Sequence, residues 1–173
     1  MNVKTKQGKK MKNKSNEVQY PKFSKWVWRN YDGTNIVSVE NFIKMHYKDF
    51  FFIGTDSQNY KKHWQCVFTT VLIAYKLRHG GSVITHTDKV SYITSLRQRL
   101  LLEAMRSLEM AWFLDGKIPK ESVISIHLDV NSNIKWESAK YKNELVSLIA
   151  SQGYKCLVKP DSFAASCVAD NKT

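Results

Sequence analysis

The spacing of apolar residues predicts three consecutive strands in the middle of the chain. Runs rich in β-branched and aromatic residues lie at Phe50–Thr55, Trp64–Leu77 and Ser82–Tyr92. Short, mostly polar stretches separate them at residues 56–63, where NYKKHW marks a polar turn, and at RHGG. Short turns join strands that run in opposite directions, so these three strands predict an antiparallel meander.

After residue 92 the pattern alternates between helices and strands. The stretch LRQRLLLEAMRSLEMAWFL contains neither Gly nor Pro and predicts a helix over 96–114, capped by Thr94 or Ser95. A strand at Ser122–Val130, a helix over 137–152, a short strand over 154–160 and a helix from Ser162 to the C-terminus complete the list. The order is β-β-β-α-β-α-β-α, which predicts an α/β fold with a mixed sheet of five strands flanked by helices.

Two segments precede this domain, which we place at residues 50–173. Residues 1–20 form a basic tail with few apolar positions, and we expect it to be disordered. Residues 21–49 form an extension with an aromatic cluster and a short helix that Ser38 caps, from Val39 to about Tyr47. The aromatic cluster must pack on another part of the protein; its members are Phe23, Trp26, Trp28 and Tyr31.

Composition places the chain among cytoplasmic single-domain proteins. Its 173 residues are 43% hydrophobic, which is enough for a sizeable core. No apolar run approaches 18 residues, so we expect neither a membrane span nor a secretory signal. The cysteines Cys66, Cys156 and Cys167 are odd in number and widely spaced, which favours reduced thiols.

The net charge of +12 points to nucleic acid as a partner. Residues 1–16 contribute six lysines and no acid, so 21 basic and 15 acidic residues remain, an excess of +6. A lysine-rich tail is either a phosphate-binding arm or a solubilising appendage, and the sequence does not choose between them. The excess in the folded part is the more informative half.

Two of the predicted strands end in a carboxylate. Asp56 follows Phe50–Thr55, and Asp129 follows the strand that begins at Ser122. If these strands are parallel neighbours, about 4.8 Å apart, the two carboxylates can hold one or two divalent cations. All-oxygen ligands suit Mg²⁺ or Mn²⁺. The competing interpretation is that each Asp only opens a turn.

A third and a fourth carboxylate are expected from the helices. Glu103 lies near the apolar stripe of its helix, but Glu109 is flanked similarly, and periodicity does not separate them. Near the C-terminus, Asp161 has the features of a helix cap. Asp170 lies in the small-residue stretch AASCVAD, which can approach the sheet closely, and is the better ligand candidate.

Four motifs in this order resemble the YkuK-like family, a group of ribonuclease H-like bacterial proteins of unknown function. They are FFIGTDSQ, LLLEAMRSLEMA, IHLDVN and VKPDSFAASCVAD, and the resemblance covers about residues 50–172. It implies a ribonuclease H-like fold with metal-binding, catalytic carboxylates at Asp56, Glu103, Asp129 and Asp170. In nucleases of this architecture two Mg²⁺ ions position a water and stabilise charge on the scissile phosphate. Nucleic-acid contacts are then expected from Ser57, Gln58, Lys140 and Lys172.

Other functions fit the sequence less well or remain open. Sugar kinases and actin-type ATPases of the same superfold need a Gly-rich phosphate loop beside the first Asp, where the chain has only Gly54, on the wrong side. A zinc site at His63 and Cys66 lacks a second ligand pair. A non-catalytic nucleic-acid-binding or scaffold protein with this fold remains open, and it would tolerate Asp56→Asn.

Overall fold

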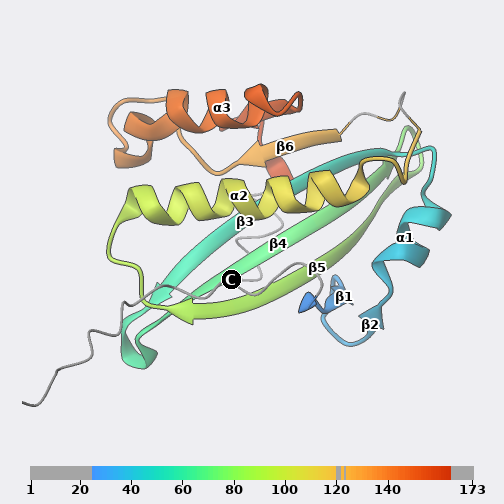
Figure 1. Cartoon of the computed structure of the whole chain (residues 1–173), viewed down its shortest axis with the longest axis horizontal. Helices are drawn as coiled ribbons and strands as arrows, with labels where there is room; N and C mark the ends of the chain where they lie inside the picture. The colour runs from blue at the N-terminus through green and yellow to red at the C-terminus, as the bar shows by residue number, and fades with distance from the viewer. Residues whose placement is uncertain (1–24, 120–121, 123, 165–173) are drawn as a thin grey trace, which may run out of the picture.

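The computed structural model describes residues 25–119, 122 and 124–164. The strands are β1 (Trp28–Asn30), β2 (Ile36–Val37), β3 (Phe50–Tyr60), β4 (Gln65–Lys76), β5 (Gly80–Ser91), β6 (Ile124–Leu128) and β7 (Lys155–Val158). The helices are α1 (Val39–Met45), α2 (Leu96–Leu114) and α3 (Lys142–Ser151), with 3₁₀ turns η2 (Lys61–His63) and η3 (Glu137–Tyr141). The α/β class predicted from the sequence is confirmed (Figure 1).

All seven strands form one mixed sheet in the order β2-β1-β5-β4-β3-β6-β7. Strands β3, β4 and β5 make the predicted antiparallel meander. β6 pairs in parallel with β3, and β7 pairs in parallel with β6. Because parallel neighbours need a crossover, α2 connects the meander to β6 and α3 connects β6 to β7.

The described part of the sheet has two more strands than the five predicted. The added strands, β1 and β2, are short and come from the aromatic extension, where β1 pairs with β5 along the outer edge of the meander. The predicted aromatic packing explains their position, because Trp28 is buried and Trp26 stacks on His86 of β5 at a centroid distance of 4.6 Å.

The helix boundaries follow the capping signals closely. The side chain of Ser38 accepts a hydrogen bond from the amide of Asn41, and that of Ser95 accepts one from Gln98. These bonds satisfy N–H groups that have no partner within the helix. The helix predicted over 137–152 begins instead with a 3₁₀ turn, η3, before α3 starts at Lys142. Most of the helix predicted after Ser162 lies outside the described residues.

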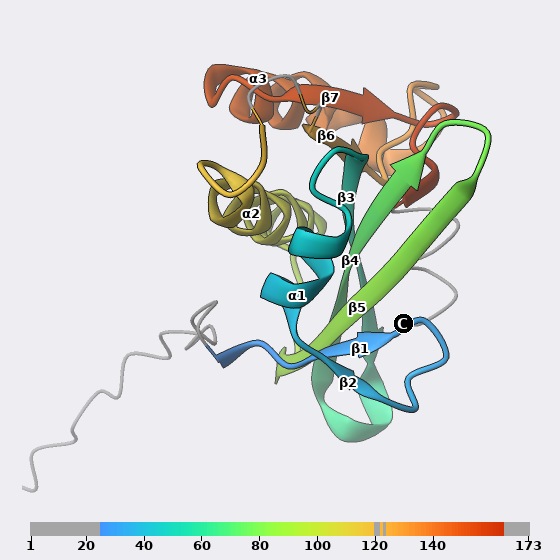
Figure 2. The same cartoon turned by 90° about the vertical axis from the view of Figure 1, so that its right-hand side faces the viewer.

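The three α-helices lie on one face of the sheet (Figure 2). Their apolar side chains surround the buried residues of β3, β4, β5 and β6 in a single large core. Phe51, Ile53 and Leu72 are fully buried there, and Leu108 and Leu114 of α2 pack against them. The opposite face carries a smaller cluster, in which Ala164 packs with residues of β3, β4 and β5.

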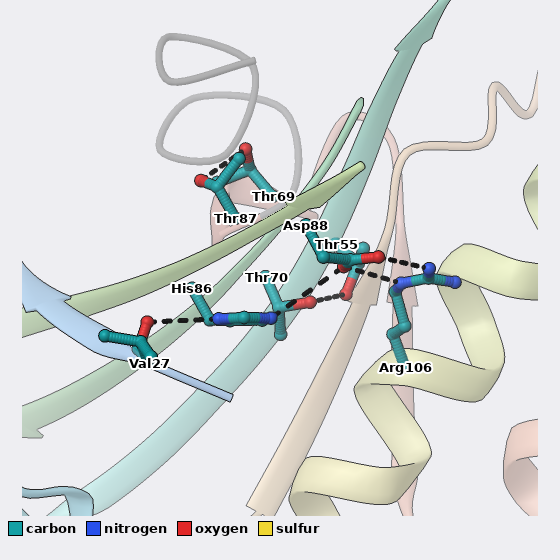
Figure 3. A network of polar contacts seen from close by, with 8 residues as sticks. All are labelled: Val27, Thr55, Thr69, Thr70, His86, Thr87, Asp88 and Arg106. Carbon is teal, nitrogen blue, oxygen red and sulfur yellow. Dashed lines mark hydrogen bonds and ion pairs between the residues drawn. The ribbon is translucent and has the colours of Figure 1, made fainter. Parts of the chain in front are cut away.

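A polar layer crosses the interface between α2 and the sheet. Arg106 of α2 donates from Nε and Nη2 to the carboxylate of Asp88 on β5, at 3.1 and 2.7 Å. Both side chains are almost wholly buried, and the guanidinium also lies over the ring of Phe68 at 3.8 Å. Figure 3 shows this pair beside His86, whose Nδ1 lies 3.0 Å from the carbonyl oxygen of Val27. The bonds between Arg106 and Asp88 fix the position of α2 over the meander.

Candidate active site at the end of β6

Asp56 and Asp129 occupy equivalent positions on parallel neighbouring strands. Thr55 of β3 pairs with Leu128, the last residue of β6, and each Asp comes one residue later. The predicted parallel pairing of these two strands is therefore present. Because the strand spacing is about 4.8 Å, this register brings the two carboxylates to the same point of the sheet.

The position of Asp56 within its own strand differs from the prediction. β3 does not end at Thr55 but continues to Tyr60, paired with β4 along its whole length. The polar residues that suggested a turn have partners inside the protein: Thr55 Oγ1 lies 3.0 Å from Thr70 Oγ1 and 2.9 Å from the hydroxyl of Ser107. Such contacts make a polar sequence compatible with a buried strand.

The early end of β6 leaves one edge of β3 open next to Asp56. From Asp56 to Tyr60, the described residues place β4 on one side of β3 and no strand on the other. Thr55 and Ser57 both reach α2, so alternation along the strand directs Asp56 to the opposite face. Groups from the two faces can therefore meet only at this open edge.

Glu103 approaches from the helix-covered face and is 4% exposed. Its Oε1 accepts a 2.5 Å hydrogen bond from the hydroxyl of Ser57. The pKa of Glu103 is raised to about 8, mainly by burial and also by the negative charges of Asp56 and Asp129, while the Ser57 hydrogen bond and Arg99 lower it. The three carboxylates thus act on one another electrostatically.

Glu109, which the sequence could not separate from Glu103, lies in a different environment. It is half-buried, and burial raises its pKa, while Arg106 lowers it and Asp88 raises it. Its electrostatic neighbours are therefore the ion pair between α2 and β5. Of the two glutamates, Glu103 is the one coupled to Asp56 and Asp129.

Two cations that we did not select from the sequence line the same site. Lys159 Nζ lies 2.5 Å from Asp129 Oδ1. Arg99 Nη1 donates to the backbone oxygen of Ser57 at 2.7 Å and to its hydroxyl at 3.3 Å. The sequence contained an indication of each position. Arg99 precedes Glu103 by one helical turn, so the two side chains lie on the same face of α2. Lys159 follows β7 in the same register that Asp129 follows β6, because Leu128 pairs with Val158.

The predicted nucleic-acid contacts are dispersed. Ser57 is buried against Glu103, so in this arrangement its hydroxyl serves the carboxylate and does not face an open surface. Gln58 is exposed, and its Oε1 accepts a hydrogen bond from the hydroxyl of Tyr60 at 3.1 Å. Lys140 is exposed on η3, the turn that precedes α3. Lys172 lies outside the described residues.

Of the two candidates for the fourth carboxylate, Asp161 and Asp170, only Asp161 lies among the described residues. Asp161 is exposed, and its amide donates to the carbonyl oxygen of Val158 at 2.9 Å. Asp170 lies outside the described residues. Within 25–119, 122 and 124–164, no group of three or more His, Cys, Asp or Glu side chains is arranged to hold a metal ion.

The weak zinc pattern at His63 and Cys66 finds no support in the structure. Cys66 is fully buried in a small core with Phe68 and Val90, whereas His63 is exposed in η2. Burial raises the pKa of the Cys66 thiol to about 11, and thiolate is the form that binds metal.

Comparison with known proteins agrees with this architecture. The model of the family described as "Ribonuclease H-like" matches residues 35–173. The chain belongs to this ribonuclease H-like family. The matched range includes β2 and α1 as well as the meander, so it begins inside the N-terminal extension.

A curated relative carries the name of the family that the motifs suggested. The ribonuclease H-like chain is 30% identical over 138 residues to the "Uncharacterized protein YkuK" of Bacillus subtilis (strain 168). The match covers 70% of this chain and 77% of that protein. No solved structure matches this chain.

Among the described residues, no helix is both long and apolar enough to cross a membrane.

Proposed function

We propose that this ribonuclease H-like protein is a divalent-metal-dependent nuclease that cleaves RNA or DNA at Asp56, Glu103 and Asp129, with Asp170 as a fourth ligand. The observation that carries the proposal is the register of β3 and β6. It brings Asp56 of β3 beside Asp129, which follows the carboxyl end of β6, and α/β sheets bind their ligands at such strand ends.

The donor chemistry fits Mg²⁺ or Mn²⁺. The groups at the open edge of β3 are carboxylates and a hydroxyl, which are the oxygen ligands that these hard cations prefer. The charges of Asp56 and Asp129 raise the proton affinity of Glu103, so a bound cation would stabilise the charged form of this carboxyl. When bound there, divalent ions polarise a phosphodiester and activate water.

Two of the carboxylates, Asp129 and Glu103, have side-chain partners in this structure. Lys159 neutralises Asp129, and burial together with the negative charges of Asp56 and Asp129 raises the pKa of Glu103 to about 8, against the opposing hydrogen bond from Ser57. In the proposed enzyme, Asp129 releases Lys159 and Glu103 loses its proton when the ligand set is completed. Arg99 and Lys159 then remain beside the site as positive charges for a phosphate.

The test is cleavage of labelled single-stranded, duplex, hybrid and branched substrates in Mg²⁺ or Mn²⁺. Asp56→Asn and Asp129→Asn should each lower the cleavage rate at least about 100-fold, because each removes a charged group from the reacting centre. Glu137→Gln is the matched control, because it removes an exposed carboxylate from η3. Its cleavage rate should equal that of the unsubstituted chain.

Three outcomes contradict the proposal. Cleavage that survives both substitutions assigns the activity to another site or to a contaminant. Equal losses in Asp56→Asn and Glu137→Gln indicate a general effect of charge. Salt-sensitive binding without cleavage, unaffected by either substitution at the site, identifies the protein as a non-catalytic nucleic-acid-binding module.

A further inference from the structure

An aromatic side chain stands exposed at the tip of the hairpin between β3 and β4. Trp64 follows the turn η2 and is 66% exposed. One face of its indole stacks on the ring of Tyr92, with centroids 4.7 Å apart and planes 15° apart. The exposure of the ring leaves its other face accessible. Tyr92 thus covers one face of the indole.

The backbone holds Trp64 in a conformation that a bulky residue rarely adopts. Its φ is 51°, in the left-handed region. Two hydrogen bonds maintain it: the amide of Trp64 donates to Lys61 O at 3.2 Å, and the amide of Tyr92 donates to Trp64 O at 3.1 Å. The side chain is exposed, so burial of the indole does not explain why the backbone adopts this strained conformation. Backbone strain of this kind is concentrated at functional sites.

The surroundings of the indole are positively charged. Residues 57–102 contain one acidic residue, Asp88, and its carboxylate is buried in the ion pair with Arg106. Lys61 and Lys62 precede Trp64 in the turn and are exposed, and Lys89 is exposed on the adjoining strand β5. The tip therefore combines an accessible aromatic ring with uncompensated positive charge, the combination that binds single-stranded nucleic acid.

The tip and the candidate active site are on the same strand. Tyr60, the last residue of β3, is four residues beyond Asp56. At about 3.4 Å per residue this is about 14 Å, which is the length of about four stacked nucleotides. Because Tyr60 pairs with Gln65, the residue after Trp64, a nucleic-acid strand bound at Trp64 lies within a few nucleotides of Asp56.

We propose that the tip formed by Lys61, Lys62, His63, Trp64 and Tyr92 binds single-stranded nucleic acid by stacking one unpaired base on the Trp64 indole. Lys61 and Lys62 contact the flanking phosphates, and the bound nucleic-acid strand continues along β3 toward Asp56. The choice of single strand over duplex follows from the ring, since only an unpaired base offers a whole face for stacking. This assignment of the substrate rests on the proposed nuclease function.

Binding of a short labelled single strand, measured by fluorescence anisotropy in EDTA, tests the surface without turnover. Trp64→Ala should raise the Kd about 5- to 100-fold, the range expected for one base–aromatic stack. Trp64→Phe, which keeps a ring, should retain most of the affinity. Lys61→Ala with Lys62→Ala should reduce the slope of log K against log salt by about 1.4. Binding to a duplex of the same length should respond to the lysines and not to Trp64→Ala.

Matched controls are available elsewhere on the chain. Trp136→Ala removes another indole, 61% exposed and next to Lys135. Lys76→Ala with Arg78→Ala removes two exposed positive charges at the other end of β4. Neither control should change the Kd as much as its counterpart at the tip. Trp64→Asn, which tolerates a positive φ, shows whether the loss comes from the ring or from the turn.

The outcomes separate this proposal from the nuclease proposal. An unchanged Kd in both Trp64→Ala and Trp64→Asn overturns the stacking contact, as does an equal effect of Trp136→Ala. Weaker binding in Trp64→Ala, together with cleavage that survives Asp56→Asn, supports the tip and rejects the nuclease site. Cleavage abolished by Asp56→Asn, together with binding unaffected by Trp64→Ala, supports the nuclease site and rejects the stacking contact at the tip.

Discussion

The hydroxyl of Ser57 donates a 2.5 Å hydrogen bond to Glu103 Oε1 across the interface between β3 and α2. This bond stabilises the charged carboxylate, yet the pKa of Glu103 is still raised to about 8, because burial and the charges of Asp56 and Asp129 outweigh it. In the metal-free protein, the protonation of Glu103 is therefore coupled to folding.

We expect Glu103 to lower stability as the pH rises. The folded pKa of about 8 lies above the ordinary value of 4.5, so the penalty is absent below pH 4.5 and complete above pH 8. Urea unfolding in EDTA should show Glu103→Gln to be more stable than the unsubstituted chain by a few kcal/mol at the alkaline end only. Glu137→Gln, an exposed carboxyl in η3, is the control. A Glu103→Gln gain that does not vary with pH would show that this carboxyl does not titrate in that window.

His127 should have the opposite pH dependence. It is 0% exposed, its Nδ1 accepts a 3.1 Å hydrogen bond from the amide of Ala164, and its ring contacts Phe52 and Phe163. Burial lowers its pKa to about 4, with a smaller contribution from Lys155. Because this value lies below 6.5, the stability that it contributes is present above pH 6.5 and lost as the pH falls toward 4.

The variant that tests this is His127→Asn, whose side-chain oxygen keeps an acceptor for Ala164 but does not titrate in this range. Its free energy of unfolding should decrease less between pH 6.5 and 4 than that of the unsubstituted chain. His79→Asn, at an exposed histidine in the turn after β4, should leave the acid-induced loss unchanged. Identical slopes for the two variants would contradict the assignment to His127.

The buried pair of Arg106 and Asp88 should tolerate double replacement better than single replacement. Asp88→Asn leaves the guanidinium without a charged partner, and we expect a loss of about 3–5 kcal/mol in the free energy of unfolding. Asp88→Leu combined with Arg106→Met replaces the pair by apolar groups and should recover most of that loss. A double-mutant cycle in urea measures the coupling. Additive losses would show that the two charges do not depend on each other.

Lys159 should compete with a metal ion for Asp129. Its ammonium lies 2.5 Å from Asp129 Oδ1, the position that a cation would take in the proposed site. Lys159→Met should therefore bind Mn²⁺ more tightly, by about tenfold if the displaced interaction is worth about 1.4 kcal/mol. Lys155→Met, on the adjoining strand β7, removes the same charge without touching Asp129 and serves as the control. Calorimetric titration that gives equal Mn²⁺ affinity for both variants would refute the competition.

Most of the fold could be read from residues whose preferences are local. The β-branched runs that became β4 and β5, the cap at Ser95 and the Gly-free helix after it appear in the structure nearly as the sequence predicted. The strands β1 and β2 were missed because they have only three and two residues, too few for a periodic signal. Their place depends on Trp28 being buried against the edge of β5, which is a tertiary contact.

The chain by itself determined two aspartates of the site, and the tertiary structure decided which other groups join them. Asp56 and Asp129 could be chosen because each follows a run of apolar residues, and that pattern is local. The choice of Glu103 over Glu109 required the packing of α2 on β3, since both residues share the same helical periodicity. Lys159 and the exposed Trp64 ring depend on register and on a left-handed backbone, properties that arise only when distant segments pair.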